Sequence, residues 1–448
     1  MTAGAIAAPG ADKLASKKTP AGLPLRLLAI ARLRDVLTGS AFIPFSATEI
    51  AEGRDRALAN RLVTTALRHQ GHLNFALSEL LDKGMPAKSG SFEAVLRLSL
   101  AQLLYLPDLG AHSAIFLAVE ALKNDKKAQH LTGLMNAVLR RAQGSGSRYW
   151  DLPSDLLFPK ALREHWIDLY GEDAVADFGI AMIDGAPLDL TMKNPEPVAV
   201  ETLGGSPIHA DSVRIETRDR PVEALPGYTE GEWWVQDAAS ALPARLLGLA
   251  PGARVLDLCA APGGKTAQLI KAGYSVTALD NDAGRLTRLK TNLDRLNYAA
   301  EVVEADAGQF KPETLYDGIL LDAPCSATGT FRRHPEVVWH RTEADINGRV
   351  TLQRRLIANA VKCLNPGGVL IYCTCSLEAE EGENQAEWVK QTMPDLEQSA
   401  ISPSELGELG FAVTPEGLVR THPGQTVPGE AGGTLDGFFV ARFRRKGL

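Results

Sequence analysis

Cysteine and long apolar runs are both scarce in this chain of 448 residues. Five cysteines, an odd number in a long chain, do not suggest a disulfide framework, so we expect a reducing, cytoplasmic location. No apolar run approaches the ~18 residues that span a bilayer, which excludes an integral membrane protein. Residues 1–24 lack the basic start and the apolar stretch of a signal peptide, and they are predicted to form a flexible tail.

Charge of one sign does not dominate the chain, but it is unevenly distributed. Hydrophobic residues make up 45% and charged residues 23%, an ordinary globular composition, and the length allows two to four domains. The formal net charge is −7. Residues 1–145 nevertheless hold 18 Lys and Arg against 11 Asp and Glu, a net of +7, which leaves −14 for the rest of the chain. Since phosphate binding depends on local patches, a nucleic-acid partner stays open.

Apolar periodicity divides the chain into three parts. Residues 25–143 have apolar positions at helical spacing, which predicts an all-helical domain. Residues 144–235 begin with a Gly- and Ser-rich linker and continue with many Pro and Gly, which predicts a small α/β connector with short strands. From 236 to 448, short apolar runs alternate with helical segments, which predicts βαβ units around a parallel sheet covered on both faces. The last run, at 437–443, is predicted to be a closing edge strand.

A glycine-rich turn follows the first predicted strand of the third part, in Val255-Leu-Asp-Leu-Cys-Ala-Ala-Pro-Gly-Gly-Lys-Thr. Ligands of open α/β sheets bind at such strand ends, and glycines let the backbone approach them. The end of this segment resembles a phosphate-binding P-loop, but Cys259 stands where that loop requires glycine, and Pro262 stiffens the turn. The dinucleotide pattern G-x-G-x-x-G is absent as well. A nucleoside cofactor without phosphates therefore fits better.

Acidic residues follow the next two predicted strands. Asp280 ends Thr277-Ala-Leu-Asp, where its carboxylate can accept both hydroxyls of a ribose, and Asp306 follows the third strand, near where an adenine would lie. This succession is the layout of an S-adenosylmethionine site. Each aspartate taken alone is equally well explained as a helix cap, so the prediction depends on their ordered series.

Two cysteines follow the fourth and fifth predicted strands, Cys325 in Asp322-Ala-Pro-Cys and Cys375 in Cys373-Thr-Cys-Ser. These strands are expected to be neighbours in a parallel sheet, so both thiols are predicted to face one ligand pocket. Methylation at carbon 5 of a pyrimidine needs such a pair, because a thiolate must add to C6 before C5 can attack a methyl group, and a base must then remove the C5 proton. Asp322 could hydrogen-bond the N3/N4 edge of a cytosine.

The other three cysteines are assigned no chemistry. Cys259 belongs to the cofactor turn, whereas Cys363 and Cys373 are predicted to be buried filler, with Cys373 turned away from the pocket. No CxxC motif and no Cys or His pair at zinc-ligand spacing occurs, so no metal is expected.

These motifs resemble those of the RNA cytosine-5 methyltransferases of the RsmB/Sun type. The segments that carry the resemblance are Leu256-Asp-Leu-Cys-Ala-Ala-Pro-Gly-Gly-Lys-Thr, Asp322-Ala-Pro-Cys-Ser, Thr374-Cys-Ser, Gly329-Thr-Phe-Arg-Arg-His-Pro-Glu-Val and Val235-Gln-Asp-Ala-Ala-Ser. In the helical part, Leu98-Ser-Leu-Ala-Gln-Leu-Leu-Tyr and Asn136-Ala-Val-Leu-Arg-Arg are similar to the NusB-like RNA-binding domain that precedes the catalytic domain there. The resemblance covers about residues 25–448. It implies a class I, Rossmann-like methyltransferase domain after a NusB-like domain and an RNA-binding connector.

The resemblance also implies a role for each site residue. Cys375 is the nucleophile, Cys325 serves in proton removal and release, and Asp322 contacts the cytosine edge. The implied contacts with S-adenosylmethionine come from the strand ends: Cys259, Ala260, Ala261, Pro262, Gly263, Gly264, Lys265, Asp280, Asp306 and Asp322. The reverse assignment of the two cysteines stays open, because other cytosine methylators use a Pro-Cys thiol as nucleophile. One departure is Leu279-Asp-Asn-Asp, where the family often has Asp-hydrophobic-Asp.

Basic residues after the Cys325 motif suit contacts with RNA phosphates. They are Arg332, Arg333, His334, Arg341, Arg349, Arg354 and Arg355, while Arg442, Arg444, Arg445 and Lys446 are equally well explained as solvated faces and a frayed tail. The expected substrate is a single-stranded or loop cytosine of 16S ribosomal RNA, unstacked at a cost of about a few kcal/mol. A transfer RNA substrate and a non-catalytic ribosome-assembly factor are the alternatives. We expect a monomer without metal or membrane partners.

Overall fold

The computed structural model describes residues 19–215, 221–429 and 431–447, and it falls into two compact units. The first unit extends to Asp151, except that Arg68–His72 belong to the second unit with the rest of the chain. Most of the predicted tail lies outside the described residues, and the first helix begins at Leu23. Within the described residues, no helix combines the length and apolarity needed to cross a membrane.

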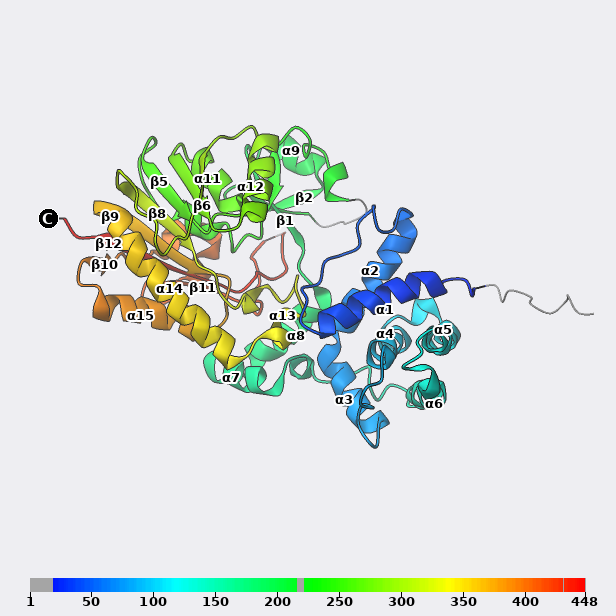
Figure 1. The fold of residues 1–448 in the computed structure, drawn as a ribbon. Helices are drawn as coiled ribbons and strands as arrows, with labels where there is room; N and C mark the ends of the chain where they lie inside the picture. Colours follow the sequence, from blue (N-terminus) through cyan, green and yellow to red (C-terminus); the bar gives the residue numbers. More distant parts are fainter. Residues whose placement is uncertain (1–18, 216–220, 430, 448) are drawn as a thin grey trace, which may run out of the picture. The chain divides into compact units, whose positions relative to one another are not determined.

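The first unit is built from helices, as predicted (Figure 1). They are α1 (Leu23–Leu37), α2 (Gly53–Arg68), α3 (Gln70–Leu80), α4 (Phe92–Tyr105), α5 (Ala111–Lys123) and α6 (Thr132–Gln143). Helix α4 lies at the centre, because ten of its fourteen residues are buried and it packs against α1, α5 and α6. Arg26 of α1 is buried against it and donates to Gln102 Oε1 at 3.0 Å, so this buried charge has a hydrogen-bond partner.

The second unit begins with two helices and a small sheet. Helices α7 (Lys160–Tyr170) and α8 (Glu172–Asp184) are followed by strands β1 (Leu188–Met192), β2 (Gly205–His209), β3 (Ser212–Ile215) and β4 (Trp233–Val235), with α9 (Pro197–Thr202) between β1 and β2. These strands form an antiparallel sheet in the order β2-β3-β1-β4. The short strands predicted for the connector are therefore present. Its boundary at residue 235 stays a prediction, because residues 152–235 belong to the same compact unit as the large sheet.

The large sheet carries the strand ends that the sequence singles out. Its strands are β5 (Arg254–Leu258), β6 (Ser275–Asp280), β7 (Glu301–Glu304), β8 (Tyr316–Asp322), β9 (Leu364–Thr374), β10 (Leu396–Gln398), β11 (Val419–Thr421) and β12 (Phe438–Arg445). The order is β10-β12-β9-β8-β5-β6-β7, with β11 paired to β12. The five strands β5 to β9 are parallel, but β10, β11 and β12 pair antiparallel, so the sheet is mixed. The prediction that β12 closes an edge is wrong, because β10 pairs with its far side.

Helices cover both faces of the large sheet, as the near-continuous apolar strands predict (Figure 1). One face packs against α10 (Leu242–Arg245), α11 (Gly264–Lys271) and α12 (Ala283–Arg295), and the other against α14 (Glu343–Cys363) and α15 (Glu383–Thr392). The short helix α13 (Val337–His340) lies between β8 and α14. This double cover leaves the carboxyl ends of β5, β6, β8 and β9 as the place for a ligand.

An aromatic core joins α7 and α8 to the segments that follow β8 and β9. The rings of Trp166 and Phe178 pack edge-on with their centroids 5.7 Å apart, and the ring of Phe331 lies tilted in the same cluster, its centroid 5.9 Å from that of Trp166. Leu377, just beyond β9, is buried in that cluster too. The helices that begin the second unit therefore fix the two cysteine-bearing segments from outside the sheet.

Candidate active site

The thiols of Cys325 and Cys375 lie together, with their Sγ atoms 3.5 Å apart. The sheet causes this proximity, because β8 and β9 are neighbouring parallel strands whose register pairs Asp322 with Cys373. The chain leaves β8 at Asp322 and β9 at Thr374, so each cysteine stands within three residues of the same sheet edge. The pattern of Asp-x-x-Cys after one strand and Cys after the next thus specifies a two-thiol pocket.

The two thiols differ in exposure and in protonation. Cys325 is 8% exposed, whereas Cys375 is half-buried and opens toward solvent. Hydrogen bonding to Cys375, followed by burial, raises the pKa of the Cys325 thiol well above its ordinary value. In the free protein Cys325 therefore stays protonated, and its S–H donates to the sulfur of Cys375.

A buried carboxylate that the sequence analysis missed links the two cysteine segments. Glu381 is fully buried and accepts hydrogen bonds from the backbone N–H of Ser326 at 2.9 Å and from Gln353 Nε2 at 3.0 Å. Its backbone carbonyl accepts from the Tyr372 hydroxyl at 2.7 Å. Ser326, the residue after Cys325, is thus bonded to Glu381, which lies six residues after Cys375. Glu381 stands in a strongly acidic stretch of sequence, where nothing distinguishes it from solvated neighbours.

A glycine contact brings the next motif against the same site. The N–H of Gly329 donates to the carbonyl of Cys375 at 3.1 Å, and its carbonyl accepts from Gly437 N at 2.8 Å. A Cβ at Gly329 would lie 2.0 Å from the carbonyl oxygen of Gly437, so only glycine permits this approach. The Gly329 motif therefore orients the backbone of Cys375.

The glycine-rich turn folds back onto the end of β6. Asp280 is buried there, and its carboxylate accepts from the N–H of Ala261 and the N–H of Asp282, both at 3.2 Å. Arg285 pairs with it at 3.3 Å and also donates to the carbonyl of Ala261 at 2.6 Å. Gly263 has a φ of +100°, a left-handed conformation that favours glycine. The turn and the acid predicted to hold a ribose therefore form one unit.

Asp257, at the end of β5, has an acceptor atom with no partner. Its Oδ2 accepts from the Thr266 hydroxyl at 2.6 Å, while Oδ1 is buried and accepts no hydrogen bond from the described residues. Burial raises the pKa of this carboxyl to about 7. An orphaned acceptor beside the turn fits a ligand with ammonium or hydroxyl donors. The residues present thus fit S-adenosylmethionine, which carries both.

Lys265 and Asp322 connect the turn to the cysteine pocket. Lys265 Nζ donates to Asp322 Oδ2 at 2.8 Å. Burial alone would lower the pKa of Lys265, but the negative charge of Asp322 outweighs burial and raises it. Asp257, Asp280 and Asp306 stand at the ends of the neighbouring strands β5, β6 and β7, and with Asp322 they line an acidic edge. Asp280, Asp306 and Asp322 each pair with a cation of this chain, so the edge offers carboxylate acceptors to a ligand without a large net charge.

The remaining predicted residues fall partly where expected. Asp306 accepts from Gly308 N at 2.8 Å and pairs with Arg355 at 3.4 Å, so part of its capacity is used within the chain. Cys363 and Cys373 are buried. The expectation that Cys373 turns away from the pocket is wrong, because its Sγ lies 3.6 Å from Asp322 Oδ1. Residues two apart in an extended chain point the same way, so Cys373 faces the side that Cys375 faces.

Arg332 does not contact solvent, so its predicted role in phosphate binding is wrong. Its side chain is fully buried and donates to Asp436 at 2.7 Å and to Asp237 at 2.8 Å. Burial raises the pKa of Asp237 to about 6. The motifs around Asp237 and Arg332 therefore stabilise the site as a buried ion cluster. Opposite charges this far apart in sequence give no signal of their pairing.

The other basic residues differ in whether their side chains are paired within the chain or exposed. Arg341 donates to the carbonyl of Ser326 at 2.8 Å, and Arg442 pairs with Glu405 at 2.6 Å, so both hold the fold. His334 and Arg355 have side chains that are 52% exposed, which leaves them accessible to a polyanion. RNA contact by these residues stays a prediction.

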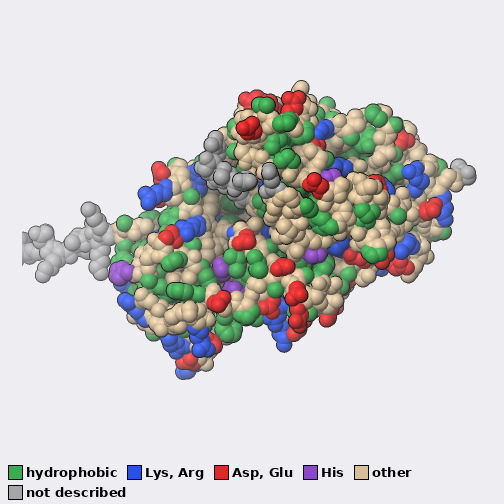
Figure 2. Space-filling model, turned by 180° about the vertical axis from the view of Figure 1, so that it is seen from behind, with side chains coloured by type: hydrophobic (Ala, Val, Ile, Leu, Met, Phe, Trp, Pro, Cys, Tyr) green, Lys and Arg blue, Asp and Glu red, His purple; other side chains and the backbone are tan. Residues whose placement is uncertain are grey.

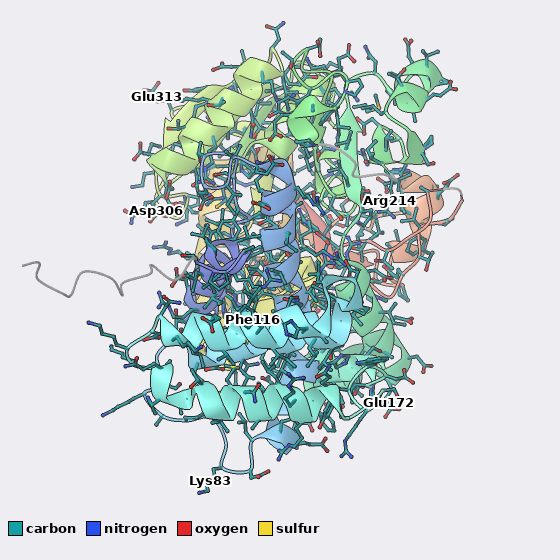
Figure 3. The ribbon with its side chains drawn as sticks, turned by 90° about the vertical axis from the view of Figure 1, so that its right-hand side faces the viewer. Lys83, Phe116, Glu172, Arg214, Asp306 and Glu313 are labelled. Carbon is teal, nitrogen blue, oxygen red and sulfur yellow. The ribbon has the colours of Figure 1, made fainter. Side chains whose placement is uncertain are left out.

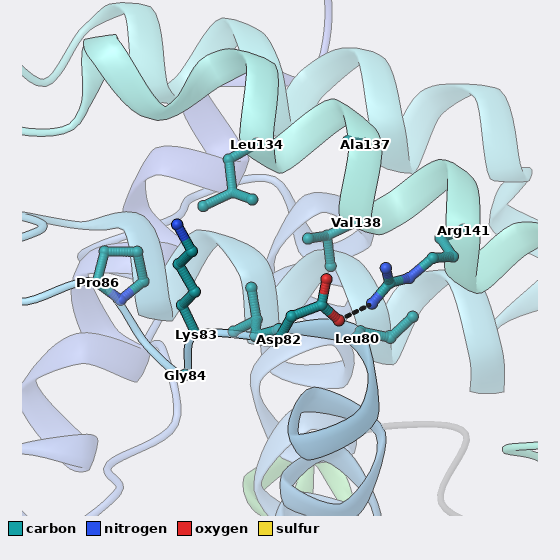
Figure 4. A pocket seen from close by; sticks show the side chains of 10 residues that line it. Leu80, Asp82, Lys83, Gly84, Pro86, Leu134, Ala137, Val138 and Arg141 are labelled. Carbon is teal, nitrogen blue, oxygen red and sulfur yellow. Dashed lines mark hydrogen bonds and ion pairs between the residues drawn. The ribbon is translucent and has the colours of Figure 1, made fainter.

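The helical unit has its own hollow, formed between the loop after α3 and helix α6. It has a volume of about 450 Å³ and an apolar floor that includes Leu80, Leu134 and Val138. Lys83 reaches over it and projects outward (Figures 3 and 4), while Arg141 pairs with Asp82 at 3.3 Å. In the space-filling view, Lys and Arg side chains gather along the lower edge of this unit (Figure 2). Such side chains suit phosphate contacts, and RNA binding by this unit stays a prediction.

Two family profiles match the chain in the order of its two units. The profile described as 16S rRNA methyltransferase RsmB/F matches residues 244–444, which include both cysteines and the glycine-rich turn. The NusB family profile matches residues 26–144, which are the helices of the first unit.

Full-length relatives and solved structures agree with this order. The ribosomal RNA small subunit methyltransferase B of Xanthomonas campestris pv. campestris is 34% identical over 449 residues, covering 96% of this chain and 98% of that protein. The crystal structure of PH0851 covers 95% of this chain and 98% of its own, with a TM-score of 0.73 and 22% identity, which shows the shared fold. NSun6 from Pyrococcus horikoshii, solved with SFG, covers 64% of this chain and 98% of its own, with a TM-score of 0.54 and 20% identity.

Identity of this extent along nearly the whole chain, together with both profiles, shows the family. The chain belongs to the RsmB/F family of S-adenosylmethionine-dependent RNA methyltransferases and carries an N-terminal NusB-family domain.

Proposed function

We propose that this protein methylates carbon 5 of a cytosine in 16S ribosomal RNA through a covalent bond between Cys375 and C6 of the base. The choice of RNA follows the relatives, which are named ribosomal RNA small subunit methyltransferase B. The proposal includes a monomer. It also includes a cytoplasmic location, because five free cysteines suit a reducing compartment.

The observation that supports the chemistry is the pair of thiols 3.5 Å apart beside the acidic edge. Methylation of an exocyclic amine needs no thiolate, whereas C5 of cytosine is unreactive until a nucleophile adds to C6. Cys375 suits that nucleophile, because it is the more exposed thiol and has Cys325 beside it as a hydrogen-bond donor. A buried thiol with a raised pKa, such as Cys325, is a poor nucleophile before the substrate binds.

The proposed steps assign one task to each side chain. The bound cofactor supplies an electrophilic methyl group. Cys375 Sγ, as thiolate, forms a bond to C6, and the electron pair of the C5–C6 double bond makes C5 a nucleophile toward that methyl group. Asp322 accepts from the N4 amino group at the cytosine edge and orients the ring, while Lys265 holds Asp322 in place at 2.8 Å.

Release requires a base at C5. Once Cys375 Sγ is bonded to carbon it no longer shares a proton with Cys325, so the largest cause of the raised pKa of Cys325 is removed. Cys325 then loses its proton to water and takes the proton from C5. The electron pair of that C–H bond reforms the C5–C6 double bond, and the C6–S bond breaks to return Cys375 as thiolate.

Bisulfite sequencing of total RNA tests the proposal. A deletion strain should lose one methylated cytosine in 16S ribosomal RNA, and the wild-type gene should restore it. Cys375→Ala should fail to restore it, whereas Cys363→Ala, which removes a thiol at the end of α14, should succeed. Loss of a mark in transfer RNA would move the substrate to that class, and an unchanged methylation pattern would favour a non-catalytic assembly factor.

A further inference from the structure

A cluster outside the thiol pocket brings together three side chains that can ligate a metal. His165 comes from α7, and Glu378 and Glu380 come from the segment after β9, three and five residues beyond Cys375. One ligand atom from each lies within 4.8 Å of the other two. The sequence predicts no metal, because these three residues are not at ligand spacing along the chain. They come together only when α7 packs against the segment that carries Cys375.

The distances within the cluster are long for hydrogen-bonded ion pairs. His165 Nε2 lies 3.4 Å from Glu378 Oε2 and 3.7 Å from Glu380 Oε2. Charge-assisted hydrogen bonds between nitrogen and carboxylate are about 2.7–2.9 Å long, so neither distance is such a bond. Ligands at about 2.0–2.2 Å from a tetrahedral ion are separated by about 3.3–3.6 Å. The two nitrogen-to-oxygen distances of 3.4 and 3.7 Å are close to that spacing, and the two carboxylate oxygens lie within 4.8 Å of each other.

The free acceptor atoms point to the same conclusion. The Glu378 side chain is 1% exposed, and its Oε1 accepts from Trp166 Nε1 at 3.1 Å. Its Oε2 and the Oε2 of Glu380 are buried, face His165, and accept no hydrogen bond from the described residues. Two carboxylates around one imidazole keep a net negative charge even when the ring is protonated. A divalent cation neutralises both carboxylates and supplies each free oxygen with a bond.

We propose that His165, Glu378 and Glu380 bind a divalent transition-metal ion of the Zn²⁺ class, with water completing its coordination. The ion would tie α7 to the segment that carries Cys375. Tyr170, one helical turn further along α7, already donates to the carbonyl of Leu377 at 2.5 Å, so the ion would strengthen an existing attachment. The proposal does not depend on the reaction proposed above.

Calorimetric titration with Zn²⁺ tests the site. The tag-free protein is used with Cys325→Ser and Cys375→Ser, so that the paired thiols do not bind the probe. We expect one Zn²⁺ per chain, and a loss of affinity of at least about tenfold on adding His165→Ala. Glu164→Gln is the matched control, since Glu164 is a neighbouring exposed carboxylate that pairs with Lys160. It should leave the affinity unchanged.

A second variant protects the test against misfolding. Glu380→Gln keeps the shape of a side chain that is 39% exposed, and it should also weaken Zn²⁺ binding at least about tenfold. Zn²⁺ should raise the melting temperature of the thiol-free background, and it should raise those of the two site variants less. Absence of Zn²⁺ binding in that background, or equal binding by His165→Ala and its parent, would overturn the site.

Discussion

The two halves of the sheet edge each contain one fully buried carboxylate, and these two carboxylates, Glu381 and Asp257, differ in how completely they are bonded. In the thiol half, beyond β8 and β9, both carboxylate oxygens of Glu381 accept hydrogen bonds and fix the segments of Cys325 and Cys375 to each other. In the cofactor half, beyond β5 and β6, Asp257 keeps a buried acceptor without a partner. Chemistry that needs two sulfurs at a set distance favours prior order, whereas a binding surface needs free polar atoms. The thiol half is therefore preorganised, and the cofactor half is completed by its ligand.

The largest effect should come from breaking the thiol half. Cys375→Ser replaces a thiolate by a hydroxyl that hardly ionises, so methylation should fall by more than about a thousandfold and no covalent RNA adduct should form. Cys325→Ser should also abolish turnover, but it leaves Cys375 able to attack. Its methylated adduct cannot lose the C5 proton and should accumulate. A denaturing gel with labelled RNA and S-adenosylmethionine shows the adduct as a shifted band.

The same gel also tests the opposite assignment of the two cysteines. A shifted band with Cys375→Ser but not with Cys325→Ser would exchange the two roles. Absence of a band with either variant would remove the support for a covalent mechanism, provided that both variants still bind RNA. Cys363→Ala, outside the pocket, should keep turnover and trap nothing.

In the cofactor half, the buried carboxyl of Asp257 should make the free energy of unfolding depend on pH. The pKa of Asp257 is raised to about 7 in the folded chain against 3.8 for an ordinary aspartate, because burial disfavours the charged carboxylate. Between those values the folded chain binds more protons than the unfolded chain, so the free energy of unfolding falls as pH rises. The slope is at most about 1.4 kcal/mol per pH unit, which gives a few kcal/mol over the window.

Asp257→Asn should remove this slope while keeping the acceptor for Thr266. Urea denaturation of both proteins without cofactor, between about pH 4 and pH 7, measures it. The wild type should lose stability across that range relative to the variant. Parallel curves for the two proteins would contradict a protonated, buried Asp257.

Glu381→Gln should weaken the bond between the two cysteine segments without removing either thiol. Glutamine keeps one acceptor oxygen, but its amide nitrogen meets a donor from Ser326 or Gln353, at a cost of about 1–3 kcal/mol. If Glu381 positions the sulfurs, kcat should fall about tenfold or more with little change in KM for RNA. Glu387→Gln, at an exposed carboxylate that pairs with Lys390, is the control for lost charge. Equal kinetics for both variants would limit Glu381 to a structural role.

The sequence predicts the thiol half and the cofactor turn because both depend on local order. Apolar runs mark the parallel strands, and residues directly after consecutive strands share an edge whatever the rest of the chain does. This is why the sequence predicts that Cys325 and Cys375 lie together and that the Gly263 turn and Asp280 form one site. Apolar positions at helical spacing predict the helices of the first unit, and this too is a local pattern. Its central helix α4 is apolar on nearly every side.

What the sequence did not predict depends on contacts between distant segments. The sequence predicts that Arg332 contacts RNA, but Asp237 from another motif and Asp436 just before β12 pair with it in the interior. Glu381 resembles the acids around it until Ser326 and Gln353 reach it. β12 gains its outer neighbours from β10 and β11, which are three residues long each and too short to recognise from periodicity. Pairing of buried charges leaves no periodic trace, so residue type alone places Arg332 at the surface and gives Glu381 no role.

The smallest effect should separate the two aspartates at the end of β6. Asp280 faces the glycine-rich turn, whereas Asp282 caps α12 by accepting from Arg285 N at 2.7 Å. Asp280→Asn keeps one acceptor for Ala261 but loses the second acceptor that a ribose diol needs, so affinity for S-adenosylmethionine should fall about tenfold, or about 1.4 kcal/mol. Asp282→Asn removes the same charge two residues away and should change affinity less than about twofold. Calorimetric titration compares them, with thermal melts to confirm folding. Equal losses in both variants would mean that charge alone attracts the cofactor, and an unchanged affinity in Asp280→Asn would remove the ribose assignment.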